Sequence, residues 1–303
     1  MRGGADRRFA GGIILSLVTV KDLSYVYSPG TPYAQAAIND VNLSFEKGEM
    51  IGIIGHTGSG KSTLIQHLNG LIKPSAGQVL LGGKDIWADP KKIREVRFRV
   101  GLVFQYPEYQ LFADTAYKDI AFGPTNMGLS EDEVDRRVRQ TARMVGVTDE
   151  MLEKSPFDLS GGEKRRVAIA GVMAMEPEVL ILDEPTAGLD PAGRDMILSR
   201  IKEYREQTGA AVLLVSHSME DTARIAEKIL VMNEGRVFRF GSVEEIYSQP
   251  EELAAIGLNV PQVTRIFMGL RQSGLPVPEG VYTVEKAKEV LLPLLRKGGG
   301  AHA

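Results

Sequence analysis

The sequence lacks several features that would indicate other classes of protein. It contains no cysteine, which excludes disulfides and cysteine-based metal or redox sites. Its formal net charge is only −3, and the basic excess that is usual in proteins that bind nucleic acid is absent, so we expect no nucleic-acid partner. No apolar run approaches the roughly 20 residues that a bilayer-spanning helix needs. If the protein serves a membrane, other subunits must cross it.

The hydrophobic pattern predicts an α/β fold. Short, almost wholly apolar runs are typical of strands buried on both faces, as in a parallel sheet. These runs are Met50–Gly55, Val100–Phe104, Val179–Leu182 and Ala211–Val215. Helical patterns lie between them: Ser130–Glu133 predicts a capping box, and Asp190–Pro191 predicts the first residues of another helix. Alternating strands and helices predict a mostly parallel sheet covered by helices.

The two ends of the chain have a different texture. Residues 1–16 are expected to form a flexible leader, followed by a β-rich stretch in which Val41, Leu43 and Phe45 alternate as in a half-exposed strand. We therefore expect a small antiparallel layer beside the parallel core, and a hairpin at residues 233–235. After about residue 241, short helical segments broken by prolines indicate a separate C-terminal module with a loose tail beginning at residues 298–300.

The strongest motif is a glycine-rich loop between a strand and a helix, the context that a phosphate-binding P-loop requires. The loop, called here the Lys61 loop, consists of Gly55, His56, Thr57, Gly58, Ser59, Gly60, Lys61, Ser62 and Thr63. Its backbone N–H groups and the helix N-terminus would bind the phosphates of ATP. Lys61 supplies a positive charge between the β- and γ-phosphates, and the Ser62 hydroxyl can bind Mg²⁺. Without nucleotide, we expect Lys61 to face solvent.

A second motif is the pair of carboxylates at the end of the strand Val179–Leu182. Adjacent strand residues point to opposite sides, which predicts different roles for Asp183 and Glu184. Asp183 suits Mg²⁺ through its water shell. Glu184 can act as general base toward the attacking water. The alternative is a solvated acidic pair at a strand end. The presence of the Lys61 loop in the same sequence favours the catalytic interpretation over that alternative.

A third motif places a hydroxyl and two glycines before a second helix. The motif, called here the signature loop, consists of Leu159, Ser160, Gly161, Gly162 and Glu163. A helix N-terminus of this kind can bind a phosphate. One nucleotide already has its site at Lys61, so we predict that the signature loop contacts the γ-phosphate of ATP held by another copy. A plain N-cap followed by a flexible glycine pair remains the alternative.

Together these motifs resemble the ABC ATPase family over about residues 17–240, a P-loop NTPase (RecA-like) core with a helical subdomain at about residues 106–172. Gln105 resembles the Q-loop glutamine, Asp190 the D-loop aspartate and His217 the switch histidine. The resemblance implies that Gln105 contacts Mg²⁺ and the attacking water, and that His217 contacts the γ-phosphate. It also implies that Asp190 links the two sites of a dimer, and that Tyr27 stacks on adenine. Tyr25, two residues before Tyr27, is the alternative for the stacking aromatic.

Within that family, residues 106–112 and 119–124 resemble the ATPases of energy-coupling factor transporters, which import vitamins and transition-metal ions. The insertion at residues 28–33 resembles the second of their two ATPase types. The resemblance implies a location on the cytoplasmic face of the membrane, held there by a transmembrane T component that the helical subdomain grips, with a substrate-binding S component. It also implies a second ABC ATPase, identical or a sister chain, and a dimerisation role for residues 241–303.

One position departs from the family pattern, and other functions were weighed. Arg165 stands where many ABC signatures carry glutamine, which we expect to leave activity intact because the phosphate contacts come from Ser160 and the glycines. A DNA-repair ABC ATPase would separate the motifs by long coiled coils. A P-loop kinase or GTPase would lack the signature loop and His217. The ATPase of a conventional ABC importer remains the closest alternative.

Overall fold

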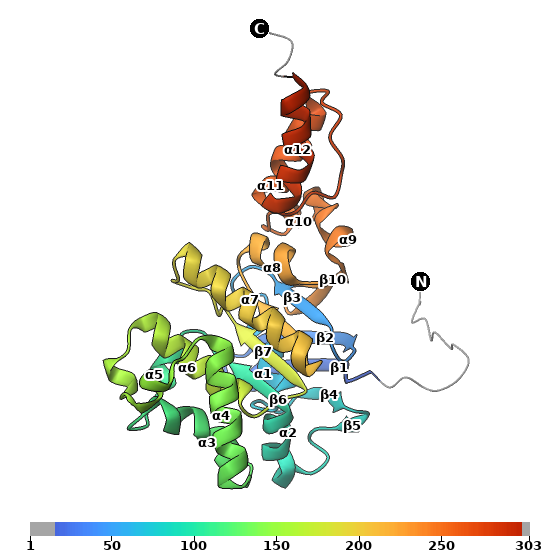
Figure 1. Cartoon of the computed structure of the whole chain (residues 1–303). Helices are drawn as coiled ribbons and strands as arrows, with labels where there is room; N and C mark the ends of the chain where they lie inside the picture. The colour runs from blue at the N-terminus through green and yellow to red at the C-terminus, as the bar shows by residue number, and fades with distance from the viewer. Residues whose placement is uncertain (1–15, 299–303) are drawn as a thin grey trace, which may run out of the picture.

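The computed structural model describes residues 16–298, so the predicted leader up to residue 15 and the tail from residue 299 lie outside the described residues. Its strands form two sheets, as the sequence predicted (Figure 1). The four-stranded antiparallel sheet has the order β2 (Gln35–Phe45), β1 (Val18–Tyr27), β4 (Ala76–Leu81), β5 (Lys84–Asp85). The six-stranded sheet has the order β10 (Arg236–Ser242), β9 (Lys228–Asn233), β3 (Met50–Ile54), β8 (Ala211–Val215), β7 (Val179–Asp183), β6 (Val100–Val103).

The larger sheet is parallel from β9 to β6, and β10 joins it as the antiparallel arm of a hairpin. Its strands are buried on both faces: along β7, Val179 and Ile181 pack toward the antiparallel sheet, whereas Leu180 and Leu182 pack toward the helices of the other face. The predicted hairpin is confirmed, with Glu234 and Gly235 at positive φ in its turn. Because β3, β8, β7 and β6 are parallel, the loops that follow them meet at one edge of the sheet.

Helices cover the sheet and form a separate lobe, drawn in green in Figure 1. Near the sheet lie α1 (Lys61–Leu68), α2 (Ile93–Arg99), α7 (Pro191–Thr208) and α8 (Met219–Ile225). The helical lobe contains the 3₁₀-helix η2 (Pro107–Gln110), α3 (Ala116–Asn126), α4 (Glu131–Val145), α5 (Asp149–Glu153) and α6 (Gly161–Met173). Asp190 caps α7 with Pro191 in the first turn, as predicted.

The predicted capping box at α4 is wrong in one half. Ser130 accepts a hydrogen bond from the backbone N–H of Glu133, but no return bond from the Glu133 side chain is formed. That carboxylate instead binds Arg136 and Arg137 at 2.7 Å, because the guanidinium groups one turn away offer charge-assisted bonds. Reciprocal capping boxes occur at Ser160–Glu163 and Ser242–Glu245.

The chain ends in a module of short helices that projects from the sheets, drawn in orange and red in Figure 1. Its elements are α9 (Val243–Tyr247), α10 (Pro250–Ala255), α11 (Gln262–Gln272) and α12 (Val284–Gly298). Phe267, Val277 and Val281 form a small core of its own. Tyr247 ties the module to α8, because its buried hydroxyl bonds Thr222. Proline-broken helices after residue 241 match the prediction, and the boundary of the module as a domain stays a prediction.

Candidate functional site

A cavity of about 320 Å³ lies where the carboxyl ends of the parallel strands meet. The Lys61 loop follows β3, Asp183 ends β7 and is followed by Glu184, Gln105 follows β6, and His217 follows β8. Residues far apart in the sequence therefore share one site. The cavity is lined by Tyr27, Gln35, Ala36, Ala37, Thr57, Gly58, Gly60, Lys61, Ser62, Thr63, Gln105, Asp183, Glu184, Val215 and His217.

Most residues of the Lys61 loop line the cavity, and the others pack against the rest of the chain. Gly60 has φ +99°, and a Cβ there would meet the Ala37 carbonyl at 2.7 Å, so only glycine fits this close approach. His56 turns away from the cavity, with Nε2 3.0 Å from the side chain of Asn233. Gly55 and Ser59 are not among the lining residues, and the buried Ser59 hydroxyl has no partner.

The expectation that Lys61 faces solvent is wrong. Its side chain is 6% exposed, and its ammonium donates hydrogen bonds to the carbonyls of Gly55 at 2.7 Å and His56 at 3.0 Å. Burial lowers the pKa of Lys61, and the nearby Glu184 and Asp183 carboxylates oppose that shift. The loop folds back over its own lysine because the loop carbonyls would otherwise be left without donors. An incoming phosphate would therefore compete with carbonyl oxygens rather than with water alone.

The side-chain directions of the two carboxylates also differ from the prediction. Asp183 and Glu184 do not point to opposite sides, because β7 ends at Asp183 and Glu184 adopts a left-handed backbone with φ +51°. That conformation is strained for a non-glycine residue. A backbone hydrogen bond from Glu184 N–H to the Val215 carbonyl, 3.0 Å long, holds the turn. Both side chains consequently line the same cavity.

Burial shifts the pKa of three side chains at this edge, Glu184, Asp183 and His217. It raises the pKa of Glu184 to about 7, an effect that the His217 backbone N–H partly offsets and that the Asp183 charge reinforces. Burial also raises the pKa of Asp183, against a hydrogen bond from Ser62. The pKa of His217 is lowered by burial and by the Lys61 charge. A carboxyl group that exchanges its proton near neutral pH suits general acid–base chemistry.

His217 lies beside the acid that the sequence assigns as base. Its Nε2 is 3.7 Å from Glu184 Oε1, and its side chain remains more than half exposed. Glu184 is far less exposed, and its Oε1 has no hydrogen-bond partner. Gln105 joins them in the lining. A buried carboxylate oxygen without a hydrogen-bond donor disfavours the ionised form, in keeping with the raised pKa of Glu184.

The donors for a magnesium ion are hard oxygens close together. Ser62 Oγ lies 3.4 Å from Asp183 Oδ2. Among residues 16–298, no group of three or more His, Cys, Asp and Glu side chains is clustered as a metal site. Mg²⁺ keeps several waters and uses only one or two carboxylates beside substrate phosphates. The hydroxyl and carboxylate fit Mg²⁺ bound together with a nucleotide, and not a metal held by protein alone.

The tertiary structure places only one of the two candidate aromatics, Tyr25 and Tyr27, in the lining of the cavity. Tyr27 lines the cavity, and its hydroxyl is 3.3 Å from the Thr63 Oγ1 atom. Tyr25 instead packs against the core and meets His67 edge-on, with ring centroids 4.9 Å apart. Sequence reasoning missed the strand residues 35–37, which line the wall beside Tyr27. The insertion before Ala37 was the only sequence signal at that wall.

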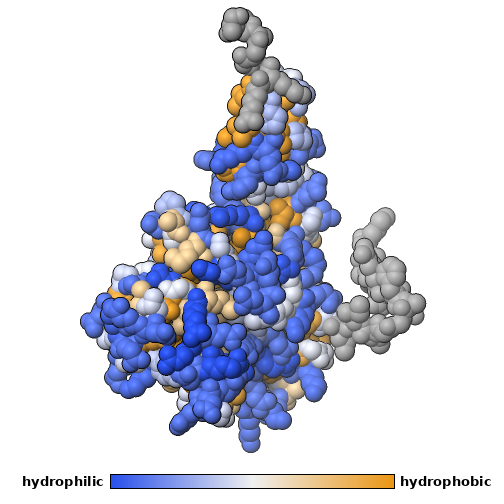
Figure 2. Space-filling model, viewed as in Figure 1, coloured by the Kyte–Doolittle hydropathy of each residue, from blue (hydrophilic) through white to orange (hydrophobic). Residues whose placement is uncertain are grey.

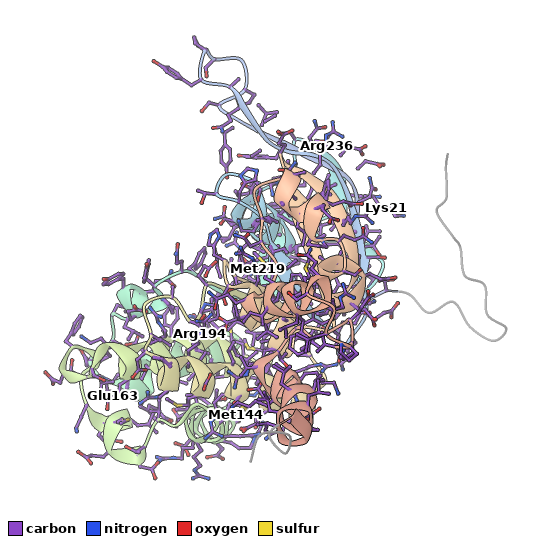
Figure 3. All side chains as sticks on the ribbon, turned by 90° about the horizontal axis from the view of Figure 1, so that it is seen from above. Lys21, Met144, Glu163, Arg194, Met219 and Arg236 are labelled. Carbon is purple, nitrogen blue, oxygen red and sulfur yellow. The ribbon has the colours of Figure 1, made fainter. Side chains whose placement is uncertain are left out.

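The signature loop lies elsewhere, in the helical lobe. Figure 3 shows Glu163 well away from Met219, which follows the strand that ends at the cavity. Helix α6 begins at Gly161, so the glycines belong to its first turn. Ser160 caps the helix in a reciprocal box: its backbone N–H donates to Glu163 at 2.7 Å, and its hydroxyl accepts from Glu163 N–H. The signature loop therefore contributes nothing to the cavity of its own chain.

A second hollow, of about 560 Å³, lies between α2, α3 and α6. Its wall is largely apolar, and Phe112 and Phe122 are strongly exposed beside it with ring centroids 5.1 Å apart. Arg94 and Arg97 border it. A large exposed aromatic patch with a charged rim is typical of a protein interaction site. Among the described helices, none has both the length and the apolar composition to cross a membrane.

Comparison with known proteins identifies the family. Residues 38–187 match the family model described as "ABC transporter". The chain is 54% identical over 279 residues to the energy-coupling factor transporter ATP-binding protein EcfA2 of Caldanaerobacter subterraneus subsp. tengcongensis, covering 92% of this chain and 98% of that protein. It is 51% identical to EcfA2 of Clostridium perfringens, with the same coverage.

Solved structures agree. CbiO1 of Clostridium perfringens, described as part of the ABC transporter complex cbiONQ, has a TM-score of 0.70 at 39% identity and covers 83% of this chain and 97% of that one. The ATP-binding cassette MJ0796, solved as a dimer in a post-hydrolysis state with ADP and phosphate, has a TM-score of 0.68 at 28% identity and covers 75% and 98%. The chain therefore belongs to the ATP-binding, ATP-hydrolysing subunits of energy-coupling factor transporters, within the ABC family.

Proposed function

We propose that this chain powers the uptake of a vitamin or a transition-metal ion through a membrane-embedded T component and a substrate-binding S component. The observation that carries the proposal is the convergence of Lys61, Ser62, Asp183 and Glu184 on one cavity at the carboxyl edge of the sheet. A phosphate-binding loop, a magnesium donor pair and a base near neutral pKa are the parts that ATP hydrolysis needs.

Within this cavity the side chains take separate roles. The Lys61 loop binds the phosphates, and the ammonium exchanges its two carbonyl partners for phosphate oxygens. Ser62, Asp183 and Gln105 would hold Mg²⁺, which would neutralise charge on the phosphates. Glu184 accepts the proton of the attacking water. His217 contacts the γ-phosphate, a role that its position beside Glu184 at the cavity rim supports.

The adenine ring would stack on the aromatic that lines the cavity. Tyr27 is partly exposed there, and the strand residues 35–37 beside it would enclose one side of the base. Stacking of a base on an aromatic side chain is sequence-tolerant and worth about 1–3 kcal/mol.

A second ABC ATPase completes the site. The signature loop, residues 159–163, is remote from its own cavity, and its Ser160 and Gly161 are exposed, which supports contact with ATP held by the partner. Asp190 would link the two sites. Figure 2 shows apolar surface on the C-terminal module, and the exposed Ile266, Leu292 and Leu295 there would be covered by the module of the other ATPase.

The membrane partner would dock in the apolar hollow between α2, α3 and α6. Phe112 and Phe122 offer an exposed aromatic wall to a partner helix. Docking there would hold the chain at the cytoplasmic face of the membrane as a peripheral subunit. Because the hollow adjoins Pro107 and Gln110, the segment after Gln105 would sense the docked helix.

Reconstitution of the assembly tests the proposal. Tagged chain is co-purified from membranes with its T and S components and a second ATPase, placed in vesicles, and supplied with ATP. ATP-dependent accumulation of a vitamin or metal ion is expected, and none is expected with Lys61→Ala. Co-purification with permeases fed by a soluble binding protein would instead identify a conventional ABC importer.

A further inference from the structure

Arg165 occupies an unusual place for an arginine. It lies in the second turn of α6, five residues after Ser160, and is only 3% exposed. Buried charged side chains need an opposite charge and satisfied hydrogen bonds. Arg165 has both, and its partners come from two different segments that line or adjoin the ATP site.

One partner segment is the turn after Gln105. Arg165 binds the Glu108 carboxylate in a two-pronged pair, with Nε 3.0 Å from Oε2 and Nη2 2.6 Å from Oε1. Its guanidinium also lies 5.8 Å from the ring centroid of Tyr106, which follows Gln105 directly and has a left-handed backbone with φ +55°. Arg165 thus holds both the strained residue and the 3₁₀-helix η2 that follows it.

The other partner segment follows the catalytic acids. Arg165 Nη1 donates to the Ala187 carbonyl and lies 3.5 Å from the Pro185 carbonyl. Pro185 directly follows Glu184, the other strained residue of the site. One guanidinium therefore joins the segments that carry Gln105 and Glu184, and it belongs to the helix that begins at the signature loop.

The same elements form the apolar hollow. Pro107 and Gln110 of η2 line it together with Val167 and Ala168 of α6. A helix pressed into the hollow would bear directly on η2 and α6. Arg165, on α6, binds η2 and also the segment after Glu184. Burial opposes the ionised form of Glu108, but the Arg165 hydrogen bond prevails and lowers the pKa of that carboxyl. The pair therefore stays charged at neutral pH.

We propose that Arg165 is a positioning residue that transmits docking in the hollow to the ATP site, through Glu108 on one side and the Pro185–Ala187 carbonyls on the other. A buried ion pair adds little net stability compared with an apolar pair of the same volume, so stability alone gives weak reason for placing one here. Displacement of η2 would move Gln105 and Glu184 together. The inference rests on the proposed function for the helix that docks in the hollow. The effect on Gln105 and Glu184 rests on this chain's own contacts.

The test uses the reconstituted assembly and measures kcat, the KM for Mg-ATP and substrate transported per ATP. Arg165→Gln is expected to lower kcat roughly ten- to hundredfold, because small misplacement of catalytic groups has effects of that size. KM should stay within about twofold, since the Lys61 loop is untouched. Glu108→Gln keeps the carbonyl contacts, so kcat should fall less while transport per ATP falls clearly.

Two further variants separate positioning from folding. Glu108→Gln with Arg165→Gln leaves no unpaired buried charge, so thermal stability should recover while kcat and transport per ATP do not. Arg137→Gln is the matched control, because Arg137 is a largely buried arginine of the same lobe that binds Glu133 and Glu176 and donates to the Met175 carbonyl. It should lower stability and leave kcat of the folded protein unchanged.

Recovery of kcat and coupling together with stability in the double variant would overturn the proposal, as would an equal kcat loss in Arg137→Gln. Failure of the proposed function is distinguishable from these outcomes, because it appears as absent ATP-dependent uptake in the unmodified assembly. In that case the kcat of Arg165→Gln in the ATPase pair still tests the contacts with Pro185 and Ala187.

Discussion

The Lys61 loop and the signature loop are both glycine-rich segments at a helix N-terminus, yet they are built differently. At Gly60 an added Cβ would meet the Ala37 carbonyl at 2.7 Å, whereas at Gly161 it would meet nothing within 4 Å. At Gly60 the first loop packs closely against its own chain, whereas at Gly161 the second loop is open. A site enclosed by one chain can bind on its own, whereas an open helix N-terminus offers half a site.

Their charged groups differ in the same way. Burial raises the pKa of Glu184 to about 7, while hydrogen bonds with Ser160 lower the pKa of Glu163. The cavity thus holds groups poised to exchange protons, and the signature loop holds a carboxylate committed to capping its helix. We therefore expect chemistry in the first region and recognition of the partner's ATP in the second.

The largest effect is expected for Glu184→Gln. The change keeps the shape of the side chain and removes the base, so hydrolysis should fall about 10²–10⁴-fold. ATP affinity should hold, and a closed ATP-bound dimer should accumulate. Asp183→Asn damages the magnesium site and should shift the metal dependence without trapping a dimer. Turnover and sedimentation with Mg-ATP measure both, and identical trapping would contradict separate roles for the two acids.

Lys61→Ala should lower hydrolysis by about 10²–10³-fold through loss of a charge on the phosphates. Because Lys61 is buried and donates to Gly55 and His56, its removal leaves two carbonyls without a donor. The free energy of unfolding should therefore fall by about 1–3 kcal/mol. Lys118→Ala, which breaks only an exposed pair with Asp114, is the control. Unchanged stability would show that the enclosed lysine contributes only to ATP binding.

Stability should depend on pH through Glu184. Its pKa rises from 4.5 in the unfolded chain to about 7 in the folded one, so the folded state binds the proton more tightly. This contribution is present in full below about pH 4.5 and is lost as pH rises through about 7. Urea unfolding gives the free energy of unfolding at pH 5 and at pH 8. The loss from pH 5 to pH 8 should be larger for the unmodified chain than for Glu184→Gln, by at most about 3 kcal/mol. Parallel curves for the two proteins would refute the shift.

Ser160→Arg should weaken ATP-dependent association of the two ATPases by about tenfold or more, with nucleotide binding by the single chain retained. Ser130→Arg is the control, because Ser130 also caps its helix, α4, by accepting a hydrogen bond from the backbone N–H three residues on, and lies outside the C-terminal module. Titration of nucleotide and sedimentation separate the two properties. Equal loss of both in Ser160→Arg, or equal loss of association in the control, would make the signature loop a plain helix cap.

The last contrast lies between the two glycines, and Gly161 should give the smallest effect of all. Gly60→Ala should lower the free energy of unfolding by about 1–3 kcal/mol, because alanine at φ +99° is strained and its methyl group meets the Ala37 carbonyl. Gly161→Ala lies in a helical turn with open space and should leave stability unchanged or raise it by up to about 1 kcal/mol. Chemical denaturation of both variants checks the contrast. A comparable loss at Gly161 would show that the open loop is packed after all.

The sequence by itself determined the α/β fold, the hairpin at residues 233–235, the capped start of α7 and the family. These features rest on local chemistry: apolar periodicity, turn residues and caps act over a few neighbouring positions. The roles of the individual site residues remain predictions, although Lys61, Glu184, Gln105 and His217 were named before the fold brought them to one cavity.

Only the tertiary structure decided three further points. Lys61 is buried because the carbonyls of its own loop need donors, and Glu184 turns into the cavity because a left-handed backbone breaks strand alternation. Tyr27 rather than Tyr25 lines the site, since His67 and the core occupy the space beside Tyr25. In each case a contact made only in the folded chain, or a strained backbone angle that packing maintains, overrides the local pattern.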